Sequence, residues 1–430
     1  MKKFFSLGIA GLGNVGLATV KLIQNNSDLI EKKAGIPIKI TAVSARKRSK
    51  DRKINIDIYD WENDALNLSE RKDIDAVVEL IGGEEGIANK LVMSSLRKGK
   101  HVITANKALL ASHSLEINTI LLNTSSGFYF EAAVAAAIPI INVINTGISS
   151  NQINYIKAIL NGTCNYILSE MKESNSSFDD ALKRAQKIGL AESDPAFDIE
   201  GIDACQKLSI LGMLAYGTKP EIKNIYTEGI KNISNLDIVY AERLGYSIKL
   251  FCIANFENKM LDFRVHPALI QLGSIASHVN GALNAIFLTG NYSKKLTFIG
   301  EGAGPDPTAS SVVSDIINAA KNRNNNQKIL LENIAEYPYL SIKERSGPYY
   351  IRFLVDDVRG VVANITSCLN ENNISLESII QEGDNKGQSG VNIVIITHDT
   401  KEYCMDKAIN IIRKMKTVLE EPKVIRVEDI

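Results

Sequence analysis

Apolar and polar positions alternate along the first 130 residues in the way that a parallel α/β sheet requires. Short apolar runs predict strands at Phe4–Ala10, Ile38–Ser44, Ala76–Ile81 and His101–Thr104. One helix is expected from about Asn14, and another ends at Lys98-Gly99-Lys100, where basic residues and a glycine are typical of a helix C-terminus. We therefore expect an α/β domain over residues 1–130.

From about residue 131 the pattern becomes mixed. A run of small residues, Glu131–Pro139, is followed by further strands and helices and then by the glycine- and proline-rich segment Gly300–Pro307. A helix is predicted at Thr308–Asn322, with Thr308 as its N-cap. We expect an α+β domain over residues 131–325, with the helix at 305–325 returning to the first domain.

The C-terminal part has its own pattern, which follows a predicted linker at 326–346. The expected order is strand, helix, strand, strand, helix, strand, at Tyr349–Val355, Gly360–Asn372, Ile374–Glu382, Gly390–Thr397, Lys401–Met415 and Val424–Glu428. This βαββαβ order is that of a ferredoxin-like domain, which we place at residues 347–430.

Composition excludes several classes of protein. The chain has 49 basic and 49 acidic residues, so nothing indicates a nucleic-acid or anionic membrane partner. No apolar stretch approaches the roughly 20 residues that span a bilayer, and the apolar N-terminus is better interpreted as a strand than as a signal peptide. The five cysteines are widely spaced, which favours reduced thiols and a cytoplasmic protein.

Gly11-Leu12-Gly13-Asn14-Val15-Gly16 lies between a predicted strand and a predicted helix. This is the context of the GxGxxG dinucleotide motif, in which the glycines allow a tight turn, close approach of the pyrophosphate and close packing of helix and strand. The phosphates then lie at the helix N-terminus. The alternative is a chance glycine turn, but the position favours a Rossmann-type dinucleotide-binding domain whose ligand contacts include Asn14 and Val15.

The end of the second strand bears on which dinucleotide binds. An NAD enzyme usually has a carboxylate there for the ribose 2′-hydroxyl. Here Ser44-Ala45 is followed by Arg46, Lys47 and Arg48, with no acid before Asp51. Arg46 can bind a 2′-phosphate through two parallel hydrogen bonds, so we expect NADP(H), with NAD(H) as the alternative cofactor. A solvated basic turn is the competing interpretation.

Two further segments carry candidate catalytic residues. Lys107 follows the fourth strand, where residues face the ligand crevice of an open α/β sheet, although a surface lysine is the alternative. Asp203 and Lys207 are four apart in a largely apolar helix predicted at Ile202–Met213, and so share one face. An exposed pair would contribute little, whereas a buried pair is costly to desolvate and is better explained by function.

A series of longer motifs follows in order along the chain. They are GLGNVG, ELIGG (79–83), GKHVITANKALLA (99–111), FEAAVAAAIPII (130–141), LNGTCNYIL (160–168), GLAESDPAFDIEGIDACQKL (189–208), RVHPALI (264–270) and GEGAGPDPTASSVVSDI (300–316). Together they resemble the bacterial homoserine dehydrogenases that carry a C-terminal ACT domain, over essentially the whole chain. The resemblance implies reversible NAD(P)H-dependent reduction of L-aspartate 4-semialdehyde to L-homoserine, in threonine, methionine and isoleucine biosynthesis.

The resemblance also implies roles for individual residues. Lys207 matches the family's proton-transfer lysine and Asp203 its substrate-binding aspartate, while Lys107 matches a lysine near the nicotinamide that is an alternative acid/base. The remaining implied contacts are Glu192, Asp198, Gly162 and Thr163 for substrate; Gly189, Glu192 and Gly302 for cofactor; and Glu131 with the carbonyls of Val134, Ala136 and Ile138 for a structural sodium ion. A homodimer or homotetramer is expected.

The chain departs from the family pattern at two places. Glu301 replaces a frequent proline, which should alter only loop rigidity, and Arg359 replaces the usual proline of the ACT turn 357–361. Threonine is the leading candidate effector, and a tail that serves only dimer contacts is the alternative. Two other functions remain as competitors: a semialdehyde dehydrogenase that uses Cys164 as a nucleophile, and an amino-acid sensor without catalysis.

Overall fold

The computed structural model describes residues 3–52, 54–323, 334–382 and 390–429. The chain divides into two compact units. The first comprises Met1–Gly162, Asp203–Asn224 and Ala282–Tyr337, and the second comprises Thr163–Ile202, Ile225–Gly281 and Pro338–Ile430. The domain limits at residues 130, 325 and 346 stay a prediction, and part of the expected linker lies outside the described residues.

The first unit contains the parallel sheet that the sequence predicts. Its strand order is β3-β2-β1-β4-β5-β6, with bounds β1 Phe5–Ala10, β2 Ile38–Ser44, β3 Asp60–Glu62, β4 Ala76–Glu79, β5 His101–Thr104 and β6 Phe128–Tyr129. This is the order of a doubly wound dinucleotide-binding fold. The chain adds β2 and β3 on one side of β1 and β4 to β6 on the other, so the order of the strands reverses between β1 and β4. The carboxyl ends of these two strands therefore form the expected ligand crevice.

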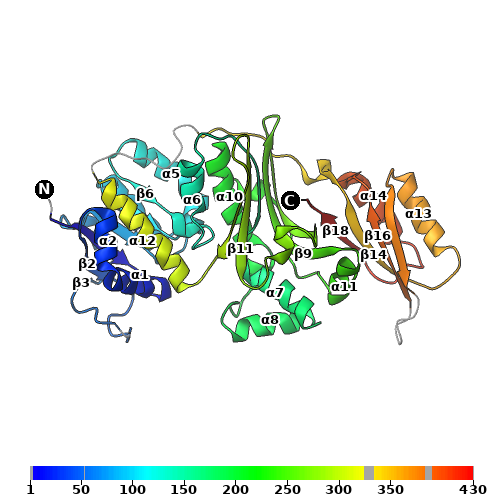
Figure 1. Ribbon diagram of the computed structural model, residues 1–430, viewed down its shortest axis with the longest axis horizontal. Coiled ribbons are helices and arrows are strands. Elements are labelled where there is room, and N and C mark those ends of the chain that lie inside the picture. The colour runs from blue at the N-terminus through cyan, green and yellow to red at the C-terminus, as the bar shows by residue number, and fades with distance from the viewer. Residues whose placement is uncertain (1–2, 53, 324–333, 383–389, 430) are drawn as a thin grey trace. The chain divides into compact units, whose positions relative to one another are not determined.

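Helices cover both faces of this sheet. They are α1 Asn14–Asn25, α2 Ser27–Ala34, α3 Asn67–Glu70, α4 Ile87–Arg97, α5 Lys107–Leu122 and α12 Pro305–Lys321. Although α12 comes late in the chain, its Val312 and Ile316 are fully buried in one cluster with Leu7 and Ile9 of β1. Figure 1 shows α12 beside α1 and α2.

The start of α12 corrects the sequence interpretation. Thr308 is not the N-cap but lies inside the helix, where its hydroxyl donates to the Gly304 carbonyl at 2.6 Å. The helix begins earlier because Pro305 stands in the first turn, where its fixed φ suits a helix and its missing N–H costs nothing.

Three strands of the first unit pair antiparallel in the order β12-β11-β7; they are β12 Lys294–Glu301, β11 Leu283–Gly290 and β7 Ile153–Ile159. Short helices η1 Glu131–Ala133, α6 Ile140–Asn142 and η2 Val143–Gly147 precede β7. The long helix α10, Ile202–Tyr216, follows the second unit's first segment and carries Asp203 and Lys207.

In the second unit, one sheet joins the middle of the chain to its C-terminus. The order is β9-β10-β18-β14-β16-β15, with β8 also on β10; the bounds are β8 Tyr226–Thr227, β9 Tyr246–Glu257, β10 Met260–Gln271, β14 Tyr349–Val355, β15 Leu376–Glu382, β16 Val391–Thr397 and β18 Lys423–Val427. Its helices are α7 Gly162–Glu173, α8 Phe178–Lys187, α9 Ala196–Ile199, α11 Asn235–Arg243, α13 Val361–Glu371 and α14 Glu402–Ile412.

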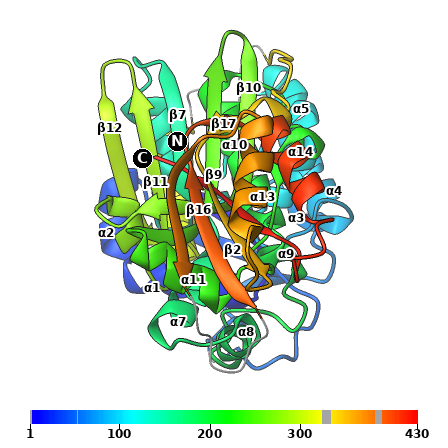
Figure 2. The same cartoon turned by 90° about the vertical axis from the view of Figure 1, so that its right-hand side faces the viewer.

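The C-terminal elements β14-α13-β15-β16-α14-β18 have the predicted βαββαβ order. Both helices pack on one face of the strands (Figure 2), around a core that includes Phe353, Leu369, Ile395 and Ile412. The last strand, β18, pairs with β10 as well as with β14. The C-terminal segment is therefore part of the second unit's sheet.

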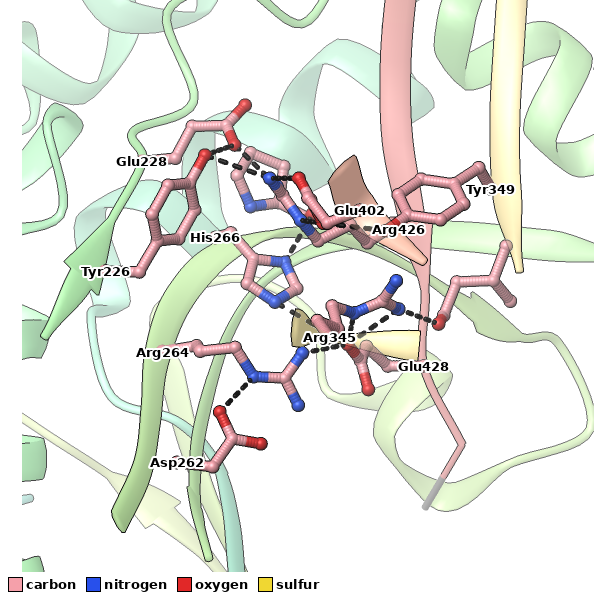
Figure 3. A network of polar contacts seen from close by, with 12 residues as sticks. Tyr226, Glu228, Asp262, Arg264, His266, Arg345, Tyr349, Glu402, Arg426 and Glu428 are labelled. Carbon is pink, nitrogen blue, oxygen red and sulfur yellow. Dashed lines mark hydrogen bonds and ion pairs between the residues drawn. The ribbon is translucent and has the colours of Figure 1, made fainter. Parts of the chain in front are cut away.

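Buried charged groups fill the junction around β18, as Figure 3 shows. Glu428 accepts from Arg264 at 3.0 Å and from Arg345 Nε at 3.1 Å. The His266 imidazole is fully buried beside them, with its Nδ1 donating to the Pro267 carbonyl at 2.9 Å and its Nε2 3.6 Å from Glu428. Such a network is stabilising only while each charge keeps its partners.

All five cysteines lie in described residues, and none forms a disulfide, as predicted. Within the described part of the chain, every helix is too short or too polar to cross a membrane.

The burial of His266 predicts a pH dependence of stability. Burial, together with the charges of Arg426, Arg264 and Arg345, holds the pKa of His266 well below its ordinary value of 6.5. Below pH 6.5 the unfolded chain therefore binds a proton that the folded chain does not, and stability falls as the pH falls. Replacing His266 with asparagine should remove about 1 kcal/mol of the loss between pH 7.5 and 5.5. Denaturant unfolding at both pH values measures the free energy of unfolding of each protein. An equal pH dependence in both proteins would contradict the lowered pKa of His266.

Candidate active site

The centre of the candidate site is the carboxylate of Asp203, which is only 5% exposed. One oxygen lies 2.8 Å from Lys207 Nζ, one helical turn away, and the other lies 3.3 Å from Lys107 Nζ at the start of α5. The predicted pair on one face of α10 is confirmed. The structure adds that Lys107, from a distant part of the sequence, reaches the same carboxylate.

Neutral donors and acceptors complete this cluster. Asn161 Nδ2 donates to Asp203 at 2.9 Å, and Lys207 Nζ also donates to the Leu160 carbonyl at 2.9 Å. Burial opposes ionisation of Asp203, but the two ammonium groups and these donors outweigh it and lower the pKa of the carboxyl below its usual value. Asp203 is therefore an anion that orients two cationic side chains.

Asn284 and Gly302 support the same carbonyl from β11 and the loop after β12. Asn284 Nδ2 donates to the Leu160 carbonyl at 3.0 Å. A Cβ on Gly302 would lie 2.0 Å from the Asn284 side chain, so this position needs glycine to keep Asn284 in place. Gly162 is restricted in the same way, because a Cβ there would meet the Ala282 carbonyl at 2.6 Å.

Lys107 is positioned by a buried network at the ends of β4 and β5. The fully buried Glu79 carboxylate accepts from the backbone of Ile81 and Gly82 and, at 2.6 Å, from the hydroxyl of Thr104. Thr104 in turn accepts from Asn106, whose side chain caps α5 by accepting from Leu109. The first residue of that helix is Lys107.

The glycine loop after β1 has the geometry that a dinucleotide needs. Gly11 has φ of +102°, and a Cβ on it would lie 2.4 Å from the Leu80 carbonyl. A Cβ on Gly16 would lie 2.0 Å from the Gly11 carbonyl, which explains the close packing of α1 on β1. Gly13 has no protein atom within 4 Å of its would-be Cβ, so its bare backbone faces open space at the N-terminus of α1.

That open space belongs to a cleft of about 610 Å³, within the usual range for a bound ligand. Its lining includes Gly11, Gly13, Arg46 and Lys50. Arg52, which is 7% exposed, shapes the basic turn by donating to the carbonyls of residues 47, 48 and 50. Arg46 itself is exposed and lines the cleft, so the residues present fit a dinucleotide.

The other predicted substrate residues belong to the second unit. Glu192 is exposed, and Asp198 is half-buried in α9. Thr163 donates to the Leu190 carbonyl at 3.2 Å. Gly189, the residue before Leu190, has φ of +76°. The roles of these residues remain predictions.

Cys164 is a poor candidate nucleophile. The residue is fully buried, and its thiol donates to the Asp198 carbonyl at 3.1 Å. Its position at the start of α7 is explained by this structural contact.

The predicted cation residues lie in the first unit. The Glu131 carboxylate is buried and accepts from the backbone of Ile141 and Asn142 at 2.8 and 2.9 Å, and burial raises its pKa despite these bonds. Ala135 and Ala136 have φ of 56° and 37°, a left-handed conformation that turns the carbonyls of this loop. The Ala136 carbonyl accepts from the Ser311 hydroxyl at 2.6 Å and the Ile138 carbonyl from the Ile140 N–H at 2.8 Å. Oxygen atoms are the donors that a hard cation takes, and the cation site itself stays a prediction.

Several residues of the site escaped prediction from the sequence. They are Glu79, Asn161, Asn284 and Arg52. The buried Lys249, which belongs to the second unit and not to the Asp203 cluster, also escaped prediction. Lys249 Nζ donates to Asn165 at 3.1 Å, to the Val279 carbonyl at 2.6 Å and to Asn280 at 2.9 Å, and burial lowers its pKa to about 8. Its signal in the sequence was a single lysine inside the otherwise apolar strand β9.

A doubly wound sheet with a glycine loop, and two lysines from α5 and α10 that one buried carboxylate holds, define a nicotinamide-nucleotide-dependent oxidoreductase. Comparison with known families agrees. Residues 11–131 match the family model described as the homoserine dehydrogenase NAD-binding domain, and residues 139–317 match that of homoserine dehydrogenase.

Relatives extend the match to the whole chain. Homoserine dehydrogenase of Helicobacter pylori is 41% identical, with 100% of both chains covered, and that of Pseudomonas aeruginosa is 37% identical, with 99% of both covered. The crystal structure of a homoserine dehydrogenase from Thiobacillus denitrificans has a TM-score of 0.93 at 37% identity, covering 99% of both chains. The chain belongs to the homoserine dehydrogenase family.

A more distant solved structure is that of a complex with a nucleotide. It is a hyperthermophilic archaeal homoserine dehydrogenase in complex with NADPH, with a TM-score of 0.62 at 25% identity, covering 73% of this chain and 97% of that one.

Proposed function

We propose that this protein interconverts L-aspartate 4-semialdehyde and L-homoserine, as an NADP-preferring enzyme of threonine, methionine and isoleucine biosynthesis. The observation that carries the proposal is the buried Asp203 carboxylate, which holds Lys207 and Lys107 at one point of the first unit. This arrangement supplies the proton donor that carbonyl reduction requires, and it places a second cation beside that donor.

When bound, the nicotinamide gives a hydride to the aldehyde carbon or takes one from the alcohol. Lys207 Nζ donates the proton that the aldehyde oxygen gains in reduction, and it accepts the hydroxyl proton in oxidation. Asp203 and the Leu160 carbonyl fix the direction of its N–H groups, so the ammonium is oriented before substrate arrives. Lys107 adds positive charge that stabilises the developing alkoxide.

The amino-acid part of the substrate needs its own partners. Homoserine carries an ammonium group, and Glu192 and Asp198 are the carboxylates we assign to it, together with the loop at Gly162–Thr163. Gly189 and Gly302 are assigned to the cofactor side. These assignments of substrate and cofactor contacts are supported by the family motifs that contain the residues.

The proton-transfer role predicts a specific defect. Lys207→Ala should lower kcat by about 10²- to 10⁴-fold, the usual loss for a general acid, while the Kd for NADPH stays nearly unchanged. Asp203 keeps Lys107 and Asn161 as partners in this variant, so the fold should persist. Asp203→Asn should instead chiefly raise KM for homoserine, because the family motif also assigns Asp203 to substrate binding. Steady-state kinetics with a nucleotide titration measures both, and activity within tenfold of the parent for Lys207→Ala would assign the proton to Lys107 or water.

The preference for NADP(H) rests on the basic turn that lines the cleft and on the missing carboxylate at the end of β2. Arg46→Ala should raise KM for NADPH and leave KM for NADH nearly unchanged. The expected change in cofactor preference is roughly 10- to 150-fold, the value of a charged bidentate contact. Arg48→Ala is the matched control, because the Arg48 guanidinium lies 3.5 Å from the Asp57 carboxylate and is not part of the cleft lining. Equal changes with both cofactors would show that Arg46 does not bind the 2′-phosphate.

A monovalent cation, most simply sodium, is proposed at Glu131 and the carbonyls of Val134, Ala136 and Ile138. The support is the buried carboxylate, which accepts from neutral N–H groups of Ile141 and Asn142, and the left-handed backbone at Ala135–Ala136. The ion would offset the buried charge and hold this loop between β6 and β7.

We further propose a cytoplasmic homodimer or homotetramer. Five cysteines outside disulfides support the location. The support for subunit association is the family resemblance.

The C-terminal segment is proposed to be an ACT-like domain that senses an amino acid, with threonine first. Its βαββαβ order and the turn at Gly360, which has φ of +87° at the start of α13, support the proposal. Saturating threonine should inhibit about 5- to 150-fold, the usual range of coupling. Threonine should inhibit the variant Arg359→Pro, which restores the family residue, at least as strongly as it inhibits the unmodified protein. If threonine, methionine and isoleucine at millimolar concentration leave both proteins unaffected, the segment is structural.

A further inference from the structure

The last strand of the chain, β18, carries a buried arginine that contacts other elements of the second unit. Arg426 of β18 is 7% exposed and forms an ion pair with Glu402 of α14. On its other side, Nη1 donates to Glu228 at 2.7 Å and Nη2 donates to the Tyr226 hydroxyl at 3.0 Å (Figure 3). The guanidinium also lies 4.7 Å from the centre of the Tyr226 ring. Arg426 thus joins the C-terminal segment to β8.

Strand β8 lies directly against the turn that ends α9. The Ile230 N–H donates to the Ile199 carbonyl at 2.9 Å. A Cβ on Gly229 would be 2.1 Å from that carbonyl, so the two backbones are in contact. Gly201 packs on Thr227 in the same way, with its would-be Cβ 3.2 Å from the Thr227 methyl. Any displacement of β8 therefore displaces residues 199–201.

This turn carries Asp198. The Asp198 carbonyl accepts from the Gly201 N–H at 2.9 Å and from the Cys164 thiol at 3.1 Å, which fixes the backbone on which the carboxylate stands. Asp203 follows only a few residues later in the chain. The contacts run without interruption from Arg426 through Tyr226 and Glu228 to the backbone of Asp198.

We propose that Arg426 is a positioning residue for the substrate-binding turn at Asp198–Gly201, so that the C-terminal strand helps to shape the amino-acid pocket. The inference rests on the proposed function, because Asp198 is taken as a ligand of the substrate ammonium. The arginine touches no substrate. Its effect is to hold β8, and through β8 the turn, at one position.

A second buried link between the same segments provides the control. Arg352 of β14 donates to Asp237 at 2.6 Å, and the Tyr350 hydroxyl donates to Asp237 at 3.3 Å. Asp237 closes the capping box of α11 with Ser234, so this link ends on α11 and not on β8. Tyr226→Phe and Tyr350→Phe therefore remove one hydrogen-bonded hydroxyl each, from the two links separately.

The experiment compares Tyr226→Phe, Arg426→Lys and Tyr350→Phe in the full chain. We expect Tyr226→Phe and Arg426→Lys to raise KM for homoserine by roughly 3- to 30-fold, the usual size of coupling through packed contacts. Their kcat and Kd for NADPH should stay within about twofold. Because they act on one link, the double variant should show less than the product of the single effects. Tyr350→Phe should lower thermal stability and leave KM unchanged.

Hydrogen–deuterium exchange of the peptide that spans residues 196–202 gives a second reading that needs no substrate. Exchange should be faster in Tyr226→Phe and Arg426→Lys than in Tyr350→Phe. Equal exchange and equal KM in all variants would overturn the proposal and leave Arg426 a purely structural residue. If the unmodified protein fails to oxidise homoserine, the proposed function is wrong, and the exchange comparison still decides whether Arg426 positions the turn.

Discussion

A buried carboxylate between two ammonium groups is the interaction on which the site depends. Asp203 is almost without solvent, and an isolated charge there would be unstable by several kcal/mol. Lys207, Lys107 and Asn161 offset that cost only when α10, α5 and the end of β7 are all in place. Correct packing of three elements is therefore a condition for ionising Asp203, and the ionised group in turn orients the lysines.

Further buried polar groups hold the elements around this carboxylate in place. Glu79 is a second fully buried carboxylate, and it holds the ends of β4 and β5 so that α5 begins where Lys107 can reach Asp203. Gly302 leaves room for Asn284, which shares the Leu160 carbonyl with Lys207. Buried polar networks of this kind specify one arrangement, because any other leaves a donor or a charge without a partner.

The contrast between predicted and missed residues has a physical explanation. The strands β2 and β5, and the Asp203–Lys207 pair, could be predicted because periodicity and i,i+4 spacing are local properties of the chain. The contact of Lys107 with Asp203, and those of Asn161 and Glu79, depend on which elements the fold brings together. Thr308 was misassigned because two helix-start signals compete there, and Pro305 begins the helix a turn earlier. The resemblance to a family supplied roles that local patterns could not.

The most direct test of the central claim is a crystal structure of the protein with homoserine and NADP⁺. We expect the substrate hydroxyl to lie about 2.6–3.2 Å from Lys207 Nζ, while Asp203 still contacts both lysines. A hydroxyl that contacts Lys107 or a water instead, with Lys207 still bonded only to Asp203 and the Leu160 carbonyl, would contradict it.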